Sequence, residues 1–243
     1  MKMAQSYLTE FYEGELHSSS KRFLEFYATI YQELAGGSFL EFGGGPTIYS
    51  LISAARYVDS IHFTDYSAES LAEVNKWLEG DPDTFDWRDY TSYALQYEEG
   101  SDAKPSPERI QARHDLIRQR IKKVTRSDAF ADDPLLGESE APYDVVANTC
   151  CLNGLTDKPE IWLQLNQKVT DLLAPGGTFL TCALLNASYW TVGDVRYPSV
   201  RLRLADVTDM YQMLGFSVTY REMIEVKGHP GYGGSILVSG RKK

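Results

Sequence analysis

Residues 38–49 read SFLEFGGGPTIY, and this stretch decides the fold. It predicts a short buried strand, a glycine turn and a helix that begins at Thr47. The next apolar segment, IHFTDY at 61–66, predicts a second strand that ends at Asp65, about twenty residues after the glycines. In open α/β sheets such glycines let the backbone approach a nucleoside closely, and the acid accepts hydrogen bonds from the ribose hydroxyls. A plain βαβ unit with a glycine helix cap is the alternative.

The composition is that of a globular protein, with 43% hydrophobic and 24% charged residues, and 243 residues suit one domain, 1–243. The net charge of -10 argues against a nucleic-acid or anionic-membrane partner, because phosphates would be repelled. No apolar run could cross a bilayer, and the first residues do not lead into a signal sequence. Cys150, Cys151 and Cys182 form no metal-binding spacing with the four histidines, so we expect no metal. The odd number of cysteines suits a reducing cytoplasm. Separately, we expect the protein to be a monomer.

An N-terminal cap is expected over residues 1–37. Its aromatic segment, residues 7–12, is either a lid over a site or an ordinary helix packed by its aromatic side chains. Residues 80–107 predict an acidic, irregular and only partly ordered excursion. The basic segment 108–124 predicts an amphipathic helix, whose charges indicate a solvated face rather than a nucleic-acid site.

The second half of the chain continues the α/β alternation. The run at 178–185 is almost wholly apolar, as a buried central strand is. The glycine pair before it, within 174–177, predicts a turn. The last two strands would form an antiparallel hairpin. Strands are predicted at 124–127, 143–149, 178–185, 218–226 and 235–240, and helices at 159–173 and 205–214.

Candidate ligand-binding residues gather at one edge of this sheet, because ligands bind outside the carboxyl ends of the strands. That edge would bring together residues 43–45, Asp65, Asp128, Thr149 and Cys182. Asp65 would hold a ribose, and Asp128 would accept a hydrogen bond from an adenine amino group, although either acid could instead cap a helix. Together the two acids favour a cofactor that contains adenosine.

Two such cofactors fit the pattern differently. NAD needs room for a pyrophosphate, usually with a third glycine, but Pro46 and Thr47 follow the turn here. S-adenosylmethionine needs no pyrophosphate site, and a helix N-terminus near Thr47 would suit its carboxylate. The sequence contains no Cys–His or Ser–His catalytic pattern, which fits methyl transfer by proximity.

Several motifs resemble those of nicotinamide N-methyltransferase and its relatives for phenylethanolamine, indolethylamine and thioethers. They are GPTIY (45–49), TDYS (64–67), KWL (76–78), FDW (85–87), LAPGG (173–177), SYWTVG (188–193) and the aromatic segment 7–12. The resemblance implies a class I methyltransferase fold, which is Rossmann-like. It has a mostly parallel seven-stranded sheet, a C-terminal antiparallel hairpin and an N-terminal helical cap. It also implies S-adenosylmethionine as the cofactor, with S-adenosylhomocysteine as its product.

The resemblance also implies which residues bind the cofactor. Two tyrosines would close over cofactor and substrate as a lid, and the glycine turn would line the methionine part. Ser70 departs from the asparagine often found in the family. The implied cofactor residues are Tyr7, Tyr12, Gly43, Gly44, Gly45, Thr47, Tyr49, Asp65, Tyr66, Ser70, Asp128, Ala129 and Thr149.

The acceptor side departs further from the family pattern. Amine-methylating relatives carry acids where this chain has Asn153 and Cys182, and neither side chain can offer the negative charge that pairs with a protonated amine. Arg196 and Arg201 lie in the segment that lines the acceptor pocket in the family, as does Arg203. We therefore expect an acceptor with an anionic group that Arg201 or Arg196 meets. The alternative is that these arginines face solvent.

Other residues could line the acceptor pocket. Tyr189 and Trp190 would flank a flat or cationic group or else pack in the core. Ser199 and Tyr232 are possible polar contacts, and His229 could act as a base if an oxygen is methylated. The expected function is N-methylation of a small molecule, and an O-methyltransferase is the nearest alternative. A non-catalytic partner that binds cofactor or protein, or a NAD oxidoreductase, belongs to other classes.

Overall fold

The central element is a seven-stranded sheet. The computed structural model describes residues 3–226 and 231–243, and within them the strands are β1 (Ser38–Phe42), β2 (Ser60–Asp65), β3 (Ile121–Arg126), β4 (Tyr143–Thr149), β5 (Leu173–Leu185), β6 (Tyr189–Val192), β7 (Val195–Pro198), β8 (Phe216–Glu225) and β9 (Gly234–Lys242). The sheet order is β3-β2-β1-β4-β5-β9-β8, and β6 and β7 form a separate hairpin. The first five strands of this order run parallel, and β9 is antiparallel to both β5 and β8. The predicted Rossmann-like sheet with its terminal hairpin is confirmed.

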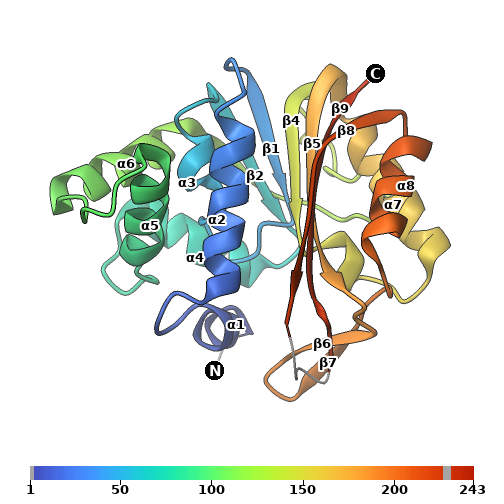
Figure 1. The fold of residues 1–243 in the computed structure, drawn as a ribbon, viewed down its shortest axis with the longest axis horizontal. Coiled ribbons are helices and arrows are strands. Elements are labelled where there is room, and N and C mark those ends of the chain that lie inside the picture. Colours follow the sequence, from blue (N-terminus) through green and yellow to red (C-terminus); the bar gives the residue numbers. More distant parts are fainter. Residues whose placement is uncertain (1–2, 227–230) are drawn as a thin grey trace.

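Helices cover both faces of the sheet, as Figure 1 shows. One face carries α2 to α6, and the other carries α7 and α8. The short helix α1 and the β6–β7 hairpin lie at one end of the molecule. The bounds are α1 (Met3–Phe11), α2 (Ser18–Tyr31), α3 (Leu51–Ala54), α4 (Ala68–Glu79), α5 (Arg88–Glu99), α6 (Pro107–Arg120), the 3₁₀ helix η1 (Leu152–Gly154), α7 (Pro159–Asp171) and α8 (Leu204–Met213). No helix in the described residues is long and apolar enough to cross a membrane.

The core consists of two apolar layers, one on each face of the sheet. Successive residues of a strand point to opposite faces, so Leu180 and Cys182 of β5 pack with the layer under α2 to α6. Phe179 and Ala183 pack with the layer under α7 and α8. Every residue from 178 to 183 is buried, which confirms that this run is a central strand.

The helix after the glycine turn is shorter than predicted, and it begins at a later residue. Residues 45–50 form turns, and α3 begins only at Leu51. The Thr47 hydroxyl donates a hydrogen bond to the Gly44 carbonyl at 2.8 Å, which stabilises a turn where a helix was expected. The predicted helix N-terminus at Thr47 is therefore wrong, and a helix dipole at Thr47 no longer supports the predicted carboxylate contact there.

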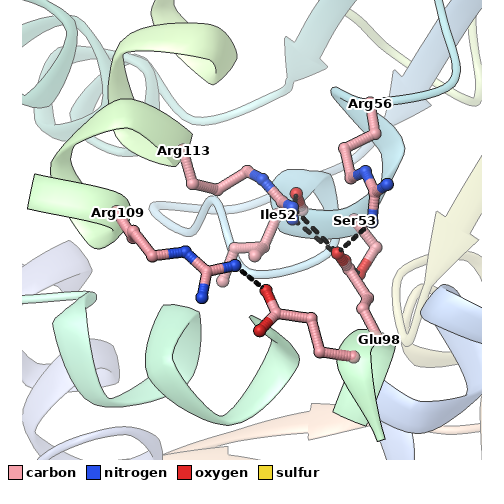
Figure 2. Close-up of polar contacts among 7 residues, drawn as sticks. Ile52, Ser53, Arg56, Glu98, Arg109 and Arg113 are labelled. Atoms are coloured by element: carbon pink, nitrogen blue, oxygen red, sulfur yellow. Dashed lines mark hydrogen bonds and ion pairs between the residues drawn. The ribbon is translucent and has the colours of Figure 1, made fainter. Parts of the chain in front are cut away.

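The acidic excursion is more ordered than predicted. Residues 88–99 form α5, which packs between α2 and α6. Glu98 of α5 is buried and pairs with Arg113 of α6 at 2.8 Å, and it also accepts a hydrogen bond from Ser53 of α3 at 2.7 Å. Figure 2 shows this network, in which Arg56, two residues after the end of α3, also reaches Glu98. The excursion is thus anchored to the short helix that follows the glycine turn.

Several boundaries also differ from the prediction. The helix at 108–124 ends at Arg120, and the residues after it belong to β3. Residues 174–177 lie inside β5 and form an irregularity in its pairing with β4, where a loop between helix and strand was expected. The hairpin of β6 and β7 was not predicted at all.

Candidate functional site

The glycine turn joins the ends of β1 and β2. The amides of Gly43 and Gly44 donate to the Thr64 carbonyl at 2.9 and 3.0 Å. Gly43 has a φ of 71°, and a Cβ on it would collide with the sulfur of Cys151. Gly45 has a φ of 63°, yet a Cβ there would meet no atom within 4 Å. The turn is therefore packed tightly on the protein side at Gly43 and has room beside Gly45.

Asp65, at the end of β2, is fixed beside this room. Its carboxylate accepts hydrogen bonds from the amides of Gly45 and Ser67, both at 2.8 Å. Burial raises the pKa of Asp65, and the two amides and the Ser70 hydroxyl work against that rise. Ser67 caps α4, because its hydroxyl accepts from the Ser70 amide at 3.3 Å. The predicted ribose acid, the glycine turn and Ser70 are thus brought together.

The same edge carries four more of the predicted cofactor residues, which are Asp128, Ala129, Tyr66 and Thr149. Asp128 follows β3, and one of its carboxylate oxygens accepts from the Phe130 amide at 2.9 Å. Ala129 is buried, whereas Tyr66 is 60% exposed and its ring stacks with the Arg126 guanidinium at 4.6 Å. Thr149, at the end of β4, shares a hydrogen bond of 2.6 Å with the Tyr27 hydroxyl.

A cluster of aromatic rings lies between α1 and this edge. Tyr12 is at its centre, with Tyr49 at a ring distance of 5.3 Å. Burial and the proximity of Cys150 and Asp65 raise the pKa of Tyr7, which shows that α1 approaches the ends of β2 and β4. The rings around Tyr12 are Tyr7, Tyr49, Phe85, Trp87 and Tyr90, with centroids 5.3 to 6.4 Å away.

The three cysteines lie near one another at the ends of β4 and β5. Cys150 has a φ of 52°, and its amide donates to the Cys182 carbonyl at 2.7 Å. Burial raises the pKa of the Cys150 and Cys151 thiols to about 12, so both stay protonated at neutral pH. Cys182 is 1% exposed, and its sulfur is 3.6 Å from the Tyr27 hydroxyl. In residues 3–226 and 231–243 no group of three His, Cys, Asp or Glu side chains could hold a metal ion.

The acceptor side is built from η1 and the β6–β7 hairpin. Trp190 donates from its indole nitrogen to the Gly154 carbonyl at 3.0 Å and stacks on Tyr197 at 4.4 Å. Ser199 is buried and donates to the Asn153 carbonyl at 3.2 Å. The structure therefore brings Asn153, Trp190 and Ser199 together, as the sequence indicated.

The arginines of the predicted acceptor segment, Arg196, Arg201 and Arg203, differ from one another in their contacts. Arg196 covers the Tyr189 ring at 3.6 Å. Arg203 is exposed and pairs with Asp206. Arg201 and Arg203 both line a groove of about 540 Å³ between α7 and α8, and Asn153, Trp190 and Ser199 do not border it. Contact of Arg201 or Arg196 with an anionic acceptor remains a prediction.

The last predicted residues are Tyr232 and His229. Tyr232 is half-buried, and burial and the proximity of Cys150 raise its pKa. His229 lies outside the described residues. No role was predicted for Cys150 or Cys151, which directly follow the end of β4 at the same edge as the glycine turn.

Comparison with known proteins adds independent information. A model of the NNMT/PNMT/TEMT family matches residues 3–233. Nicotinamide N-methyltransferase of Homo sapiens is 28% identical over 227 residues, which cover 90% of this chain and 84% of that protein. Phenylethanolamine N-methyltransferase of Homo sapiens is 28% identical over 188 residues, which cover 76% of this chain and 64% of that protein.

Solved structures show the same fold at lower identity. A DhpI complex with S-adenosylhomocysteine has a TM-score of 0.61 at 19% identity, and the match covers 98% of this chain and 91% of that chain. The glycopeptide N-methyltransferase MtfA complexed with sinefungin has a TM-score of 0.57 at 16% identity and 96% coverage of both chains. These likenesses extend over nearly the whole chain.

Proposed function

Because the chain belongs to the NNMT/PNMT/TEMT family of S-adenosylmethionine-dependent methyltransferases, we propose that it transfers a methyl group to a nitrogen of a small-molecule acceptor. The observation that carries this proposal is the placement of Asp65. Its carboxylate is fixed by the Gly45 and Ser67 amides beside the one part of the glycine turn that has room for a ligand.

The residues at this edge fit the cofactor. S-adenosylmethionine supplies a methyl group that its sulfonium charge already activates. Asp65 would accept hydrogen bonds from the ribose hydroxyls, and Asp128 would accept one from the adenine amino group. The packing of Gly43 against Cys151 fixes the turn, so its amide edge stays in place when the ligand binds.

In this proposal the residues of the chain act mainly by positioning the reactants and by excluding water from the site. The Tyr12 cluster covers the edge with apolar rings, which would exclude water from the reacting atoms. The acceptor nitrogen must reach the methyl group with its lone pair unprotonated, so the acceptor side must hold it in line. Trp190 and Ser199, held against η1, are the residues placed to do this.

The other candidate functions have less support. An O-methyltransferase would need a base, for which the sequence offers His229 outside the described residues. A non-catalytic partner that binds only protein would need neither the Asp65 geometry nor the room beside Gly45. We further propose a monomer in the cytoplasm, where the three unpaired cysteines would stay reduced, with no nucleic-acid partner given the charge of -10.

Calorimetric titration with S-adenosylhomocysteine tests the proposal. The wild-type chain should bind it, and Asp65→Asn should weaken binding about 10- to 100-fold, since hydrogen bonds to a charged group are worth roughly 1.5–3 kcal/mol. Asp102→Asn removes the same charge from an exposed loop and should leave binding unchanged. Mass spectrometry with isotopically labelled S-adenosylmethionine and nitrogen-containing metabolites should then reveal a methylated product. Equal affinity of the wild type and Asp65→Asn would contradict the proposed cofactor site.

A further inference from the structure

A groove of about 510 Å³, named here the α1 groove, lies between helix α1, helix α4 and residues 83–90. Gln5, Leu8 and Thr9 of α1 line it, and their spacing of three or four residues places them on one face of the helix. Tyr7 lies on the opposite face and approaches Asp65 instead. Helix α1 therefore stands between this groove and the edge of the sheet that carries Asp65.

Acids from several elements line the α1 groove. They are Glu13, Glu73, Asp83, Asp86 and Asp89. No Lys or Arg is among the described residues that line it. Lys76 pairs with Glu73 and Arg88 with Asp86, both from outside the lining, and the other three acids have no ion-pair partner in the described chain. The groove therefore carries a negative charge that a cationic ligand would complement.

Glu73 of α4 is a buried acid with one oxygen left for a ligand. Its side chain is 8% exposed, and its Oε1 accepts a hydrogen bond from the Lys76 ammonium group at 3.1 Å. Its Oε2 has no hydrogen-bond donor within the described residues, yet this atom is not sealed from solvent, and the α1 groove is the cavity that Glu73 lines. Oxygens of buried carboxylates are normally paired, because an unpaired one loses its hydration. The free oxygen therefore indicates a donor that enters from the groove.

Aromatic rings and the spacing of the acids indicate which kind of cation fits. Tyr12, Phe85 and Tyr90 line the α1 groove, and their ring centroids lie 5.9 to 6.5 Å apart. Aromatic faces attract ammonium groups and pack against methylene groups. In residues 3–226 and 231–243 no three acids converge on one point as a metal ion would require, so the carboxylates of the groove are spread out. Several ammonium groups joined by methylene chains match this arrangement, and a compact metal ion does not.

We propose that the α1 groove binds a linear polyamine and that this binding holds α1 in place. The groove is distinct from the predicted acceptor side, since neither Trp190 nor Ser199 borders it. Tyr12 belongs both to the groove and to the aromatic cluster with Tyr49, so a ligand in the groove also restrains that cluster. Without a cation, Glu13 next to α1 is repelled by the acids of the other walls.

The polyamine site does not depend on the proposed function, but its consequence for the cofactor does. Restraining α1 and Tyr12 stabilises the residues proposed to cover the cofactor, so the polyamine should tighten the binding of S-adenosylhomocysteine. By linkage S-adenosylhomocysteine should tighten the binding of the polyamine by the same factor.

Calorimetric titration of the full chain with spermidine tests the site, at low ionic strength because salt screens exposed charges. Hexaamminecobalt(III) has the same charge in a compact form, and butylamine has a single ammonium group. Spermidine should bind about tenfold more tightly than either, because its ammonium groups reach separate carboxylates and rings. Asp83→Asn with Asp89→Asn should remove this preference. Glu79→Gln with Asp102→Asn removes the same charge outside the groove and should keep it; all four side chains are exposed, so both variants should fold.

Titration with S-adenosylhomocysteine, with and without saturating spermidine, tests the coupling. Spermidine should tighten its binding about fivefold in the wild type and in the control variant, and should not change it in Asp83→Asn with Asp89→Asn. An affinity for S-adenosylhomocysteine that spermidine leaves unchanged in the wild type would overturn the coupling.

Two outcomes would overturn the site itself. Equal spermidine affinity of the two double variants, which have the same net charge, would show that the acidic chain attracts spermidine without the groove. Binding of hexaamminecobalt(III) or butylamine as tight as that of spermidine would exclude a polyamine as the specific ligand. If the wild type does not bind S-adenosylhomocysteine at all, the proposed function fails, and the spermidine titrations still decide whether the groove is a polyamine site.

Discussion

Replacing Arg113 by methionine would leave the Glu98 carboxylate buried without its principal partner. Glu98 and Arg113 are 3% and 7% exposed, and two hydrogen bonds of 2.9 and 2.8 Å join them. Arg113 also donates to the Ile52 carbonyl at 2.9 Å, so the pair connects α5 and α6 to α3 (Figure 2). After the substitution Glu98 keeps only the Ser53 hydroxyl and the half-exposed Arg56.

The expected loss is large. Breaking a buried ion pair by removing one partner costs about 3–5 kcal/mol, and the remaining contacts of Glu98 favour the lower value of about 3. For a chain of this length each kcal/mol lowers the melting temperature by roughly 2–4 °C, so Arg113→Met should melt about 6–12 °C below the wild type. Calorimetry at pH 7 measures this. Glu98→Gln combined with Arg113→Met should cost less than the sum of the single changes, because neither charge is then left unpaired.

The loss should also depend on pH. Burial alone would raise the pKa of Glu98, but Arg113, the Ser53 hydroxyl and Arg56 together outweigh burial and hold the pKa below its ordinary value. A carboxylate with a lowered pKa stabilises the folded state above its unfolded pKa, near 4.5, and loses that effect as the pH falls through the folded value. The difference between the wild type and Arg113→Met should therefore be full at pH 7 and should narrow below about pH 4.5.

A matched control lies on the same two helices. Arg109 of α6 pairs with Glu99 of α5, but Arg109 is 54% exposed, so Arg109→Met should cost less than about 1 kcal/mol. If Arg113→Met costs no more than Arg109→Met, the reasoning that burial gives this network its importance is refuted.

Three further changes test other parts of the structure. Burial raises the pKa of Glu41 to about 8, so between pH 4.5 and 8 the folded chain keeps a proton that the unfolded chain loses. The free energy of unfolding should therefore fall by up to about 1.4 kcal/mol per pH unit across this range. Glu41→Gln should remove this fall, which denaturation at several pH values would measure. Burial lowers the pKa of His114 to about 4, so stability should rise with pH between about 4 and 6.5, and an NMR titration in which His114 protonates near 6.5 would contradict this. Gly43→Ala should lose S-adenosylhomocysteine binding, because the added Cβ would collide with both the sulfur and the Cβ of Cys151. The addition of Cys151→Gly should restore part of the binding. No restoration would show that the positive φ of Gly43, rather than the collision with Cys151, is decisive.

The sequence predicted well that the glycine turn and Asp65 lie together, because short-range patterns determine their geometry. The glycine turn and Asp65 belong to one strand–turn–strand unit, and the structure places them in contact. The range 143–149 of β4 was also predicted correctly, because a run of buried residues bounded by polar segments is typical of a parallel central strand. The cap at Ser67 follows from a serine that directly precedes an apolar period.

Other features of the fold were not predicted from the sequence, because their sequence patterns were weaker than those of neighbouring residues or because they depend on tertiary packing. The tyrosines at 90, 93 and 97 have the spacing of a helix face, yet the prolines and acids around them indicated irregular structure, and α5 was missed. The β6–β7 hairpin turns at Gly193 and Asp194, a pair of residues that is common in two-residue hairpin loops. The position of Arg201 could not be predicted, because it depends on how α7 and α8 pack together.

Helix α1 and the β6–β7 hairpin, the predicted lid and the predicted acceptor segment, depend on each other. Helix α1 has nine residues, too few for stability on its own, and β6 and β7 pair only with each other in the described chain. The Gly193 amide donates to the Glu10 carboxylate at 2.8 Å, and the Tyr197 hydroxyl contacts the Met3 sulfur at 3.5 Å. Tyr12, which directly follows the C-terminal end of α1, anchors the helix in the aromatic cluster.

Because neither element is stable alone, a movement of α1 away from the edge removes contacts from the hairpin as well. The hairpin carries Trp190, which is held against η1, so the same movement loosens the acceptor side. Helix α1 and the β6–β7 hairpin are therefore one structural unit in this chain. A ligand that stabilises either half stabilises the other, since both share the contacts of α1.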